Sequence, residues 1–501
     1  MIFAALAWQD LHAADSLGSG GYASVTDLAA PESIAAPRVA DPSLPAKENP
    51  VTKAEDRSTK DKTKEDKKDE APGEKGNDAK DEIKDDKEFK EQRFNCYGQT
   101  SVITQWHDPF HSLYEGPHSF RSEAEMRTSA TATLMLGGKL WHGAELYFDP
   151  EIACGRGDSD VYGIGGFPNG DITRVGRPEP TPYVARLYAS QSIGFGGEQE
   201  RIEAGPHQLA SIKDVSRLTF TVGKFAATDF FDNNKYSHDP RSQFMNWALM
   251  YNPAWDYPAD ARGYTLGAVF ELNQKNWAIR YGILAEPQVA NGQDLDTTYS
   301  LAHGQVVELE NRYTLDQRPG KIRWMFYWNR ANMGNYREAL ALSPVNPDIT
   351  ATASYSNIKY GFGINIEQDL TDNLGGFFRF GWNDGQSESW AYTEVDRTIS
   401  LGVVLKGTRW GRPQDQLGTA VAIDGISSSH AAYLAAGGLG FILGDGQLNY
   451  DPELVWESYY RFELKKDSIW ISPDFQLIGN PGYNNDRGPV AVYALRVHAE
   501  F

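Results

Sequence analysis

Charged side chains recur at every second position in several segments of the chain, a spacing that puts them on one face of a β-strand. Guanidinium and carboxylate groups form charge-assisted hydrogen bonds, so such rows can bind polar solutes without reacting with them. Alternatively, any one of these charged residues could serve only to solvate a wide polar interior. We expect these residues to point into a common interior and to contact a solute there, with Glu457 and Glu500 on the same faces: Arg186, Arg280, Arg323, Arg379, Arg461, Arg496, Glu145, Glu271, Glu286, Glu367, Glu463 and Asp474.

A second group of polar residues is concentrated in one stretch, DFFDNNKYSHDPRSQFMN. Amides, acids and an arginine lie there among phenylalanine and tyrosine, a mixture that suits recognition of hydroxyl groups. We predict that this stretch is a loop folded into the interior, where it narrows the passage; alternatively, it only braces the surrounding sheet. Its candidate residues are Asp229, Asp232, Asn233, Asn234, Asp239, Arg241 and Asn246.

No stretch of the sequence has the spacing of a catalytic site. It contains no nucleophile elbow, no H-E-x-x-H and no Cys–His constellation, so we expect neither an enzyme nor a cofactor. His107, His111 and His118 fit no strong zinc pattern, and we predict no metal site. The two cysteines, Cys96 and Cys154, could form one disulfide in an oxidising compartment or remain two thiols.

The composition narrows the class of protein further. The 501 residues carry a formal net charge of −20, which argues against nucleic acid as a partner, because nucleic acid requires a basic surface. Aromatic residues make up 12% of the chain, yet there is no run of about 18 apolar residues that could form a transmembrane helix.

The first 93 residues differ from the rest. Residues 1–23 begin with a short apolar run, MIFAALAWQ, and we interpret them as the remnant of a secretory signal peptide or as an N-terminal tail. Residues 24–93 are rich first in Ala and Pro and then in Lys, Asp and Glu, as in KDKTKEDKKDE from Lys60. We predict a disordered linker, because almost nothing in it could be buried. It could contact a partner such as the cell wall, or act only as a solvated spacer.

From residue 94 to residue 501 apolar and polar residues alternate, and we assign this region to one barrel domain. The apolar half of each alternation is continuous and often aromatic, as in the row Trp324, Phe326 and Trp328, whereas the other half carries charges. Sixteen strands are predicted, over residues 98–106, 126–136, 141–149, 182–192, 216–225, 262–272, 276–286, 305–315, 319–330, 358–369, 373–383, 391–406, 413–424, 456–465, 468–478 and 490–501.

The connections between these strands alternate between short and long. NQK, DQRP, TDN and KKD are short, and GGKL (137–140) is expected to be the first short turn. Short turns at one end and long loops at the other are typical of an outer-membrane barrel. We therefore predict an all-β fold, a transmembrane antiparallel barrel of about 16 strands with short periplasmic turns and long extracellular loops. Residues 193–215 break the rule, because they should be a short turn and are not.

The final strand explains why the chain can stop on alternating apolar residues. In hydrocarbon every backbone N–H and C=O group needs an internal partner, so the sheet must close on itself. The last strand, VAVYALRVHAEF, would pair with the first. Its terminal Phe501 is similar to the signal through which bacterial outer-membrane barrels reach their assembly machinery.

Several stretches resemble the carbohydrate-selective outer-membrane porin family (OprB family). They are GKFAATDFFDNNKYSHDPRSQFMNWALMYNPAWDYPADARGYTLGAVFEL, PYVARLYASQ, GTRWGRPQDQLGTAVAIDGIS and YYRFELKKDSIWISPDFQLIGNPGYNN. The resemblance covers about residues 94–501 and implies sixteen strands in the outer membrane. It implies passive uptake of saccharides such as glucose, through a pore narrowed by inward loops and ring charges. Homotrimers are usual for porins, although the sequence shows no interface.

Two other functions fit the same sequence. The barrel region is acidic, so a general or weakly cation-selective porin is one alternative. A barrel that displays its long loops as an adhesin is the other, since an adhesin needs only the loops.

Overall fold

The structure is a computed structural model, and its described residues are 89–172 and 178–501. The predictions made for the N-terminal tail, residues 1–23, and for nearly all of the linker, residues 24–88, lie outside the described residues.

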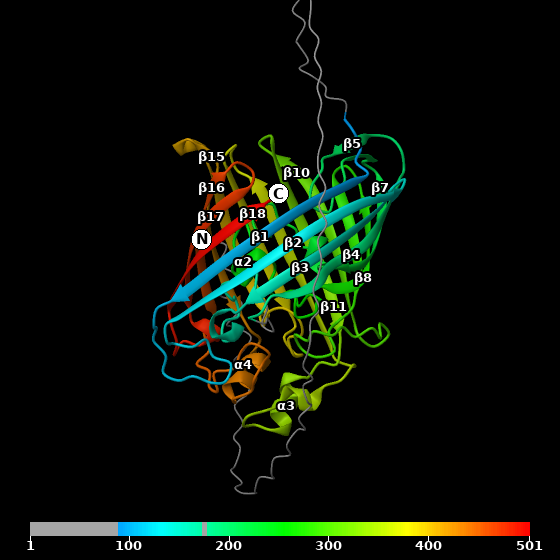
Figure 1. Ribbon diagram of the computed structural model, residues 1–501. Helices are drawn as coiled ribbons and strands as arrows, with labels where there is room; N and C mark the ends of the chain where they lie inside the picture. Colours follow the sequence, from blue (N-terminus) through cyan, green and yellow to red (C-terminus); the bar gives the residue numbers. More distant parts are fainter. Residues whose placement is uncertain (1–88, 173–177) are drawn as a thin grey trace, which may run out of the picture. The chain divides into compact units, whose positions relative to one another are not determined.

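Within the described residues, sixteen antiparallel strands close into a barrel, which confirms the predicted fold and strand number. Each predicted segment overlaps one of them (Figure 1). The barrel strands are β1 (Phe94–His107), β2 (Glu125–Trp141), β3 (Ala144–Gly155), β4 (Thr181–Gly194), β7 (Arg217–Phe225), β8 (Thr265–Asn273), β9 (Trp277–Leu284), β10 (His303–Leu315), β11 (Arg318–Arg330), β12 (Ile358–Asp369), β13 (Leu374–Asn383), β14 (Arg397–Gly407), β15 (Arg412–Gly425), β16 (Glu453–Lys465), β17 (Ile469–Gly479) and β18 (Val490–Glu500).

The other elements of the described residues are short and lie in the connections. β5 (Gln199–Ile202) and β6 (Ser211–Asp214) form a separate two-stranded sheet. The helices are α2 (Trp247–Met250), α3 (Tyr336–Leu342) and α4 (Ser428–Ala435), and the 3-10 turns are η1 (Asp158–Val161), η2 (Ala227–Asp229), η3 (Ile349–Thr352), η4 (Thr408–Trp410) and η5 (Pro481–Tyr483). No helix of the described residues is long and apolar enough to span a membrane.

The two ends of the described chain close the barrel. β18 pairs with β1 in antiparallel register from Gln99↔Glu500 to His107↔Val492. The backbones of Gly98 and Phe501 exchange two further hydrogen bonds, of 2.9 and 3.0 Å. Closure leaves no free sheet edge, which is the condition for crossing hydrocarbon.

The outer face of the barrel is apolar and the inner face is polar. On β11, Phe326 is 55% exposed on the outside, whereas its inward-facing neighbour Arg323 is 2% exposed. Phe326 lies opposite Phe362 of β12, so aromatic side chains continue across the strands. A soluble sheet would bury these aromatics, and their outward position therefore suits contact with lipid.

Several strand boundaries were predicted wrongly. GGKL lies inside β2 and is not a turn, because β2 stays paired with β3 as far as Trp141↔Ala144, and the turn is His142–Gly143. β14 begins at Arg397, six residues later than predicted, because residues 391–396 form part of the preceding loop and are buried there.

Of the two states left open for Cys96 and Cys154, a disulfide or two thiols, the structure has the free thiols. Register explains why. Cys96 lies opposite Leu136 of β2, and Cys154 lies opposite Ala130 of the same strand. Six residues along β2 correspond to about 20 Å, far beyond the reach of a disulfide.

Replacing Phe326 by Arg tests the outward face. Because Phe326 lies near the middle of β11, we expect the Phe326→Arg variant to lose about 2–4 kcal/mol of unfolding free energy in lipid vesicles. Guanidinium titration with Phe326→Leu as the control measures this loss. Equal stability of the two variants would show that this face does not contact hydrocarbon.

Candidate pore constriction

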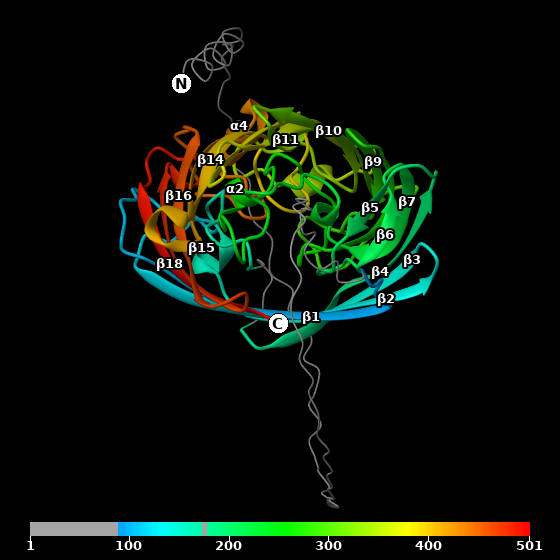
Figure 2. The same ribbon diagram turned by 90° about the horizontal axis from the view of Figure 1, so that it is seen from above.

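The long connection between β7 and β8, residues 226–264, lies inside the barrel and is called here the inner loop. Figure 2 shows its helix α2 within the ring of strands. Phe231, Phe244 and Trp255 of the inner loop are fully buried, and Trp247 is nearly so. In an external loop these side chains would face water, so the hydrophobic effect favours their position in the lumen. The Asn246 side chain caps α2 by accepting a hydrogen bond from the backbone N–H of Ala248.

Buried polar contacts fix the inner loop to β12 and β13 of the barrel wall. Arg379 forms an ion pair with Asp232 at 3.2 Å. The same guanidinium donates hydrogen bonds to the carbonyls of Leu249 (2.9 Å) and Ser237 (2.6 Å). Asn365 of β12 donates to the Asp232 carboxylate at 2.6 Å. Three residues of the loop and two of the wall thus share one buried network, which holds the loop in one position.

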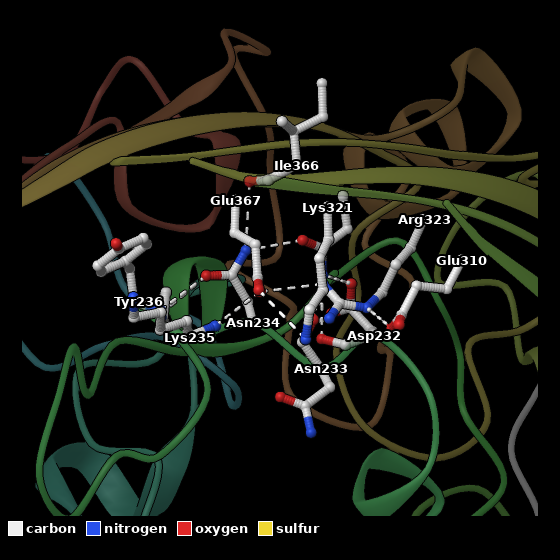
Figure 3. Close-up of polar contacts among 12 residues, drawn as sticks. Asp232, Asn233, Asn234, Lys235, Tyr236, Glu310, Lys321, Arg323, Ile366 and Glu367 are labelled. Carbon is white, nitrogen blue, oxygen red and sulfur yellow. Dashed lines mark hydrogen bonds and ion pairs between the residues drawn. The ribbon is translucent and has the colours of Figure 1, made fainter. Parts of the chain in front are cut away.

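A second contact of the inner loop lies beside the first (Figure 3). Arg323 is bound between the carboxylates of Glu310 (2.9 Å) and Glu367 (3.0 Å). Glu367 also accepts a hydrogen bond from the backbone N–H of Lys235 at 2.9 Å. Asn234 donates to the carbonyl of Ile366 at 3.3 Å.

Glycines in the wall make close docking of the inner loop feasible. A Cβ atom at Gly363 of β12 would lie 2.4 Å from the amide nitrogen of Asn252 in the loop. A Cβ atom at Gly381 of β13 would lie 2.1 Å from the amide oxygen of the same residue. A side chain at either position would therefore force the Asn252 side chain out of its present position.

The inner loop is also bound to the strands near the chain's end. Glu457 of β16 accepts hydrogen bonds from the backbone N–H groups of Met245 (2.7 Å) and Asn246 (2.9 Å). The Asn246 side chain contacts Gln476 of β17 at 2.9 Å, and Asp474 accepts a hydrogen bond from Gln476 at 3.2 Å. Arg496 of β18 donates to the carbonyls of Pro240 (2.5 Å) and Gln243 (2.9 Å).

On its other side the inner loop leaves a cavity of about 670 Å³. The cavity runs along β1 to β4, from Tyr97 and Phe501 at the turn end of the barrel to Gly155 and Thr181 at the loop end. It therefore extends over the length of the strands. Of the residues predicted to face inward or to narrow the passage, it is lined by Arg186, Asp229, Asp239, Arg241 and Glu500.

Two arginines connect the inner loop to the wall of this cavity. Arg241 of the loop binds Asp171 at 2.7 Å and Glu151 of β3 at 3.1 Å. Arg186 of β4 binds both carboxylate oxygens of Asp229 in the loop, at 2.7 and 2.6 Å. The two arginines thus point in opposite directions across the gap between loop and wall, and each is compensated by carboxylates.

The charges of the loop residues follow from this pairing. Burial would raise the pKa of Asp229, but the positive charge of Arg186 outweighs it and holds that pKa below its ordinary value. For Asp171, burial raises the pKa by more than Arg241 lowers it. Burial would lower the pKa of Arg241, but the charges of Asp171 and Glu151 hold it well above its ordinary value. Arg241 and Asp229 are therefore charged at neutral pH.

Aromatic side chains surround the charged groups of the cavity. The hydroxyls of Tyr183 and Tyr264 both donate to Glu151, the latter at 3.2 Å. Tyr392 packs on Trp247 and on Tyr257, with ring centroids 4.9 and 4.6 Å apart. Flat apolar faces beside paired donors and acceptors suit a solute that has hydroxyl groups around an apolar ring.

Other predicted contact residues form the wall of the barrel away from this cavity. Arg280 binds Glu271 at 2.5 Å and Glu308 at 2.9 Å, in a network across β8, β9 and β10. Glu286 lies in the connection after β9, fully buried. Asn233 contributes its backbone carbonyl to Asn365 at 3.3 Å, and its side chain points away from the contacts of Figure 3.

The remaining predicted residues lie toward the turn end. Glu145 binds Lys213 of β6 at 3.0 Å. The guanidinium of Arg461 lies 4.1 Å from the centroid of the Trp470 ring. Glu463 accepts a hydrogen bond from the backbone N–H of Asp467 in the β16–β17 turn, at 2.8 Å.

Four residues that line the cavity were not among the predicted contact residues: Glu151, Asp171, Tyr183 and Tyr264. Glu151 continues the inward alternation of Tyr147 and Asp149, but the predicted strand stopped before Pro150, where the pairing of β3 with β4 shifts register. Following the alternation past Pro150 would have included it. Asp171 lies in a long loop, where no periodicity marks a side chain as inward.

Comparison with known proteins adds to this geometry. The family model described as carbohydrate-selective porin, OprB family, matches residues 118–501. No curated protein matches the chain.

Among solved structures, the high-pH structure of Pseudomonas putida OprB is similar over 82% of this chain and 94% of its own, with a TM-score of 0.62 and 16% identity. The low-pH structure of the same protein covers 82% and 93%, with a TM-score of 0.44 and 13% identity. The outer membrane channel DcaP of Acinetobacter baumannii covers 81% and 97%, with a TM-score of 0.44 and 7% identity. With a sequence identity of 16%, the similarity to the high-pH OprB structure establishes a common fold.

The Arg379→Ala change tests whether the inner loop is held by its buried contacts. It leaves Asp232 without its cation, so we expect a loss of about 3–5 kcal/mol of unfolding free energy. We also expect a larger and noisier single-channel conductance from a loosened loop. The control is Arg318→Ala, which breaks an ion pair with the largely exposed Asp372 and should cost less than about 1 kcal/mol. A steady wild-type conductance in Arg379→Ala would contradict this role.

Proposed function

The chain belongs to the OprB family of carbohydrate-selective porins, and we propose that it carries glucose and sugars of similar size through the cavity beside the inner loop. Its family and fold are those of channels and not of enzymes. The protein is an integral β-barrel of the outer membrane. Transport through such a pore is passive and follows the concentration gradient of the solute.

The observation that carries the proposal is the pair of arginines that join loop and wall. Each guanidinium is neutralised by carboxylates within 3.1 Å, so the site offers many hydrogen-bonding atoms with local charge compensation. A neutral sugar can exchange hydrogen bonds with such atoms, and its apolar ring faces can contact Tyr183 and Tyr264. Because the donors already have partners, the sugar is bound weakly and can leave, as permeation requires.

The cavity has a suitable size for this role. Its volume of about 670 Å³ lies within the range of about 300–1,000 Å³ that small-molecule sites occupy. The residues that line the cavity extend from the turn end to the loop end of the strands, which supports a route past Arg241 between the two ends of the barrel.

A preference for cations is a second candidate property of the same pore. Seven acidic and three basic side chains line the cavity: Glu151, Asp171, Asp229, Asp239, Asp260, Asp467 and Glu500 against Arg186, Arg241 and Arg262. This excess of negative charge would attract cations and repel anions. It does not hinder a neutral sugar.

Liposome swelling with the purified protein tests the proposed function. We expect glucose and other monosaccharides to permeate faster than amino acids and salts of similar size. Rates ordered by size alone would mean a general porin. Absence of swelling with a folded, heat-modifiable barrel would contradict an open pore.

Replacing Arg241 by Met tests the proposed sugar contact. The change removes donors and leaves Glu151 and Asp171 without their cation. If one hydrogen bond of about 1 kcal/mol is lost, the ratio of glucose to amino-acid permeation falls about fivefold. We expect cation selectivity, measured as reversal potential in a salt gradient, to rise at the same time. Arg409→Met, on an exposed turn, is the matched control and should leave both values unchanged.

A further inference from the structure

One turn-side connection of the barrel is unlike the others. Six of the seven are two to four residues long, whereas β4 and β7 are joined by residues 195–216, called here the turn-side insert. The pairing of Gly194 with Arg217 shows that no such length is needed, since the strand ends are already adjacent. Leu315 and Arg318 pair in the same way, and a turn of only two residues, Asp316 and Gln317, joins their strands. The additional residues therefore have another purpose than joining two strands.

The insert is built as a structured element. β5 and β6 pair over four residues, and Arg217 binds Glu200 at 2.6 Å at their base. Its tip, residues 203–210, contacts the start of the barrel. The side chain of Asn95 donates hydrogen bonds to the carbonyls of Gly205 (3.1 Å) and Gln208 (2.9 Å). Leu209 at the tip is only 1% exposed, so the tip is packed against other groups.

The tip brings His207 to the cavity beside the inner loop. Ala204, Gly205, Pro206 and His207 all line this cavity. His207 takes a left-handed backbone conformation (φ 56°), which is uncommon for a residue other than glycine and turns its side chain out of the hairpin. Its ring packs near Tyr147 and Tyr188, with centroids 6.0 and 6.4 Å apart, and its side chain keeps 22% of its surface exposed.

His207 is connected to the arginine pair through one carboxylate. Its Nε2 lies 2.6 Å from Asp149, which is fully buried. The same oxygen of Asp149 lies 3.3 Å from Arg186, and Arg186 binds Asp229 of the inner loop. A chain of contacts thus runs from the turn-side insert, through the wall, to the inner loop.

We propose that the turn-side insert is an exit filter of the pore and that His207 is its specificity-determining residue. The imidazole offers a hydrogen-bonding atom and a flat face to a saccharide that leaves the cavity, and through Asp149 it positions Arg186. This proposal rests on the proposed sugar transport for its substrate class. It adds a second point of selection, on the turn side of the barrel, which the inner loop does not supply.

The physical consequence is a narrower and more selective exit. Without the insert, Asp149 would lose the His207 contact and Glu145 would lose its ion pair with Lys213. The passage would then be wider at the turn end, and Asp149 and Glu145 would face it without these two partners. Larger saccharides should pass.

The experiment compares four variants with the wild-type protein in single-channel recordings and liposome swelling. In the first, an Asn-Gly turn replaces residues 195–216, as the two-residue turn after Leu315 suggests. The others are His207→Ala, His207→Gln and the control His142→Ala, an exposed histidine of the β2–β3 turn. Glucose, a disaccharide and a trisaccharide serve as probes, and heat-modifiable mobility on gels verifies each barrel.

We expect the short-turn variant to conduct at least about twice the wild-type current and to admit the trisaccharide. His207→Ala should lower the ratio of glucose to disaccharide permeation about fivefold, the effect of about one hydrogen bond. His207→Gln, which keeps a donor to Asp149, should retain most of the wild-type ratio, and His142→Ala should match the wild type.

A folded short-turn variant with wild-type conductance and sugar order would overturn the exit filter. Wild-type ratios in His207→Ala would overturn the role of His207, even if the short-turn variant fails to fold. Failure of the proposed sugar transport is seen separately, as a wild-type protein that ranks all solutes by size. In that case a higher conductance of the short-turn variant would still support the insert as a barrier.

Discussion

A sheet that crosses hydrocarbon cannot leave an unpaired edge, and the rest of this structure depends on that constraint. β1 and β18 satisfy it by pairing along nine residues of each strand, although they lie at opposite ends of the described chain. Once the ring is closed, every strand has one face toward lipid and one toward the lumen. Aromatic residues such as Phe326 must then face outward, and charged residues such as Arg323 must face inward.

The closed ring creates a lumen that is too wide to select small solutes, and the inner loop occupies much of it. Its aromatic residues fill the lumen, and buried contacts to Arg379, Glu457 and Arg496 fix it along β13, β16 and β18. The cavity that remains lies along β1 to β4. Its position is thus decided by where the loop is bound, and its chemistry by the residues that line it.

The fold could be predicted from the sequence because each strand displays the constraint locally. Alternation with an apolar and often aromatic face, as at Trp324, Phe326 and Trp328, is visible within the strands themselves. The position of the site is harder to predict from the sequence. Alternation indicates that Arg186 and Arg379 both face inward, but it does not indicate which residues each one contacts. Arg379 meets the loop and is buried, whereas Arg186 borders the cavity. Pro150 and the register shift beside it concealed Glu151, and no repeating pattern places Asp171.

The contacts of the inner loop also constrain the order in which the protein can assemble. The inner loop follows β7 in the sequence, but the strands that hold it, β13, β16 and β18, come much later in the chain. Until then its buried aromatics Phe231, Phe244 and Trp255 have no lumen to enter, and contacts at such sequence separation form slowly. The inner loop can therefore reach its final position only after β13, β16 and β18 have joined the sheet. Narrowing of the pore is a late event of folding, coupled to the arrival of the last strand.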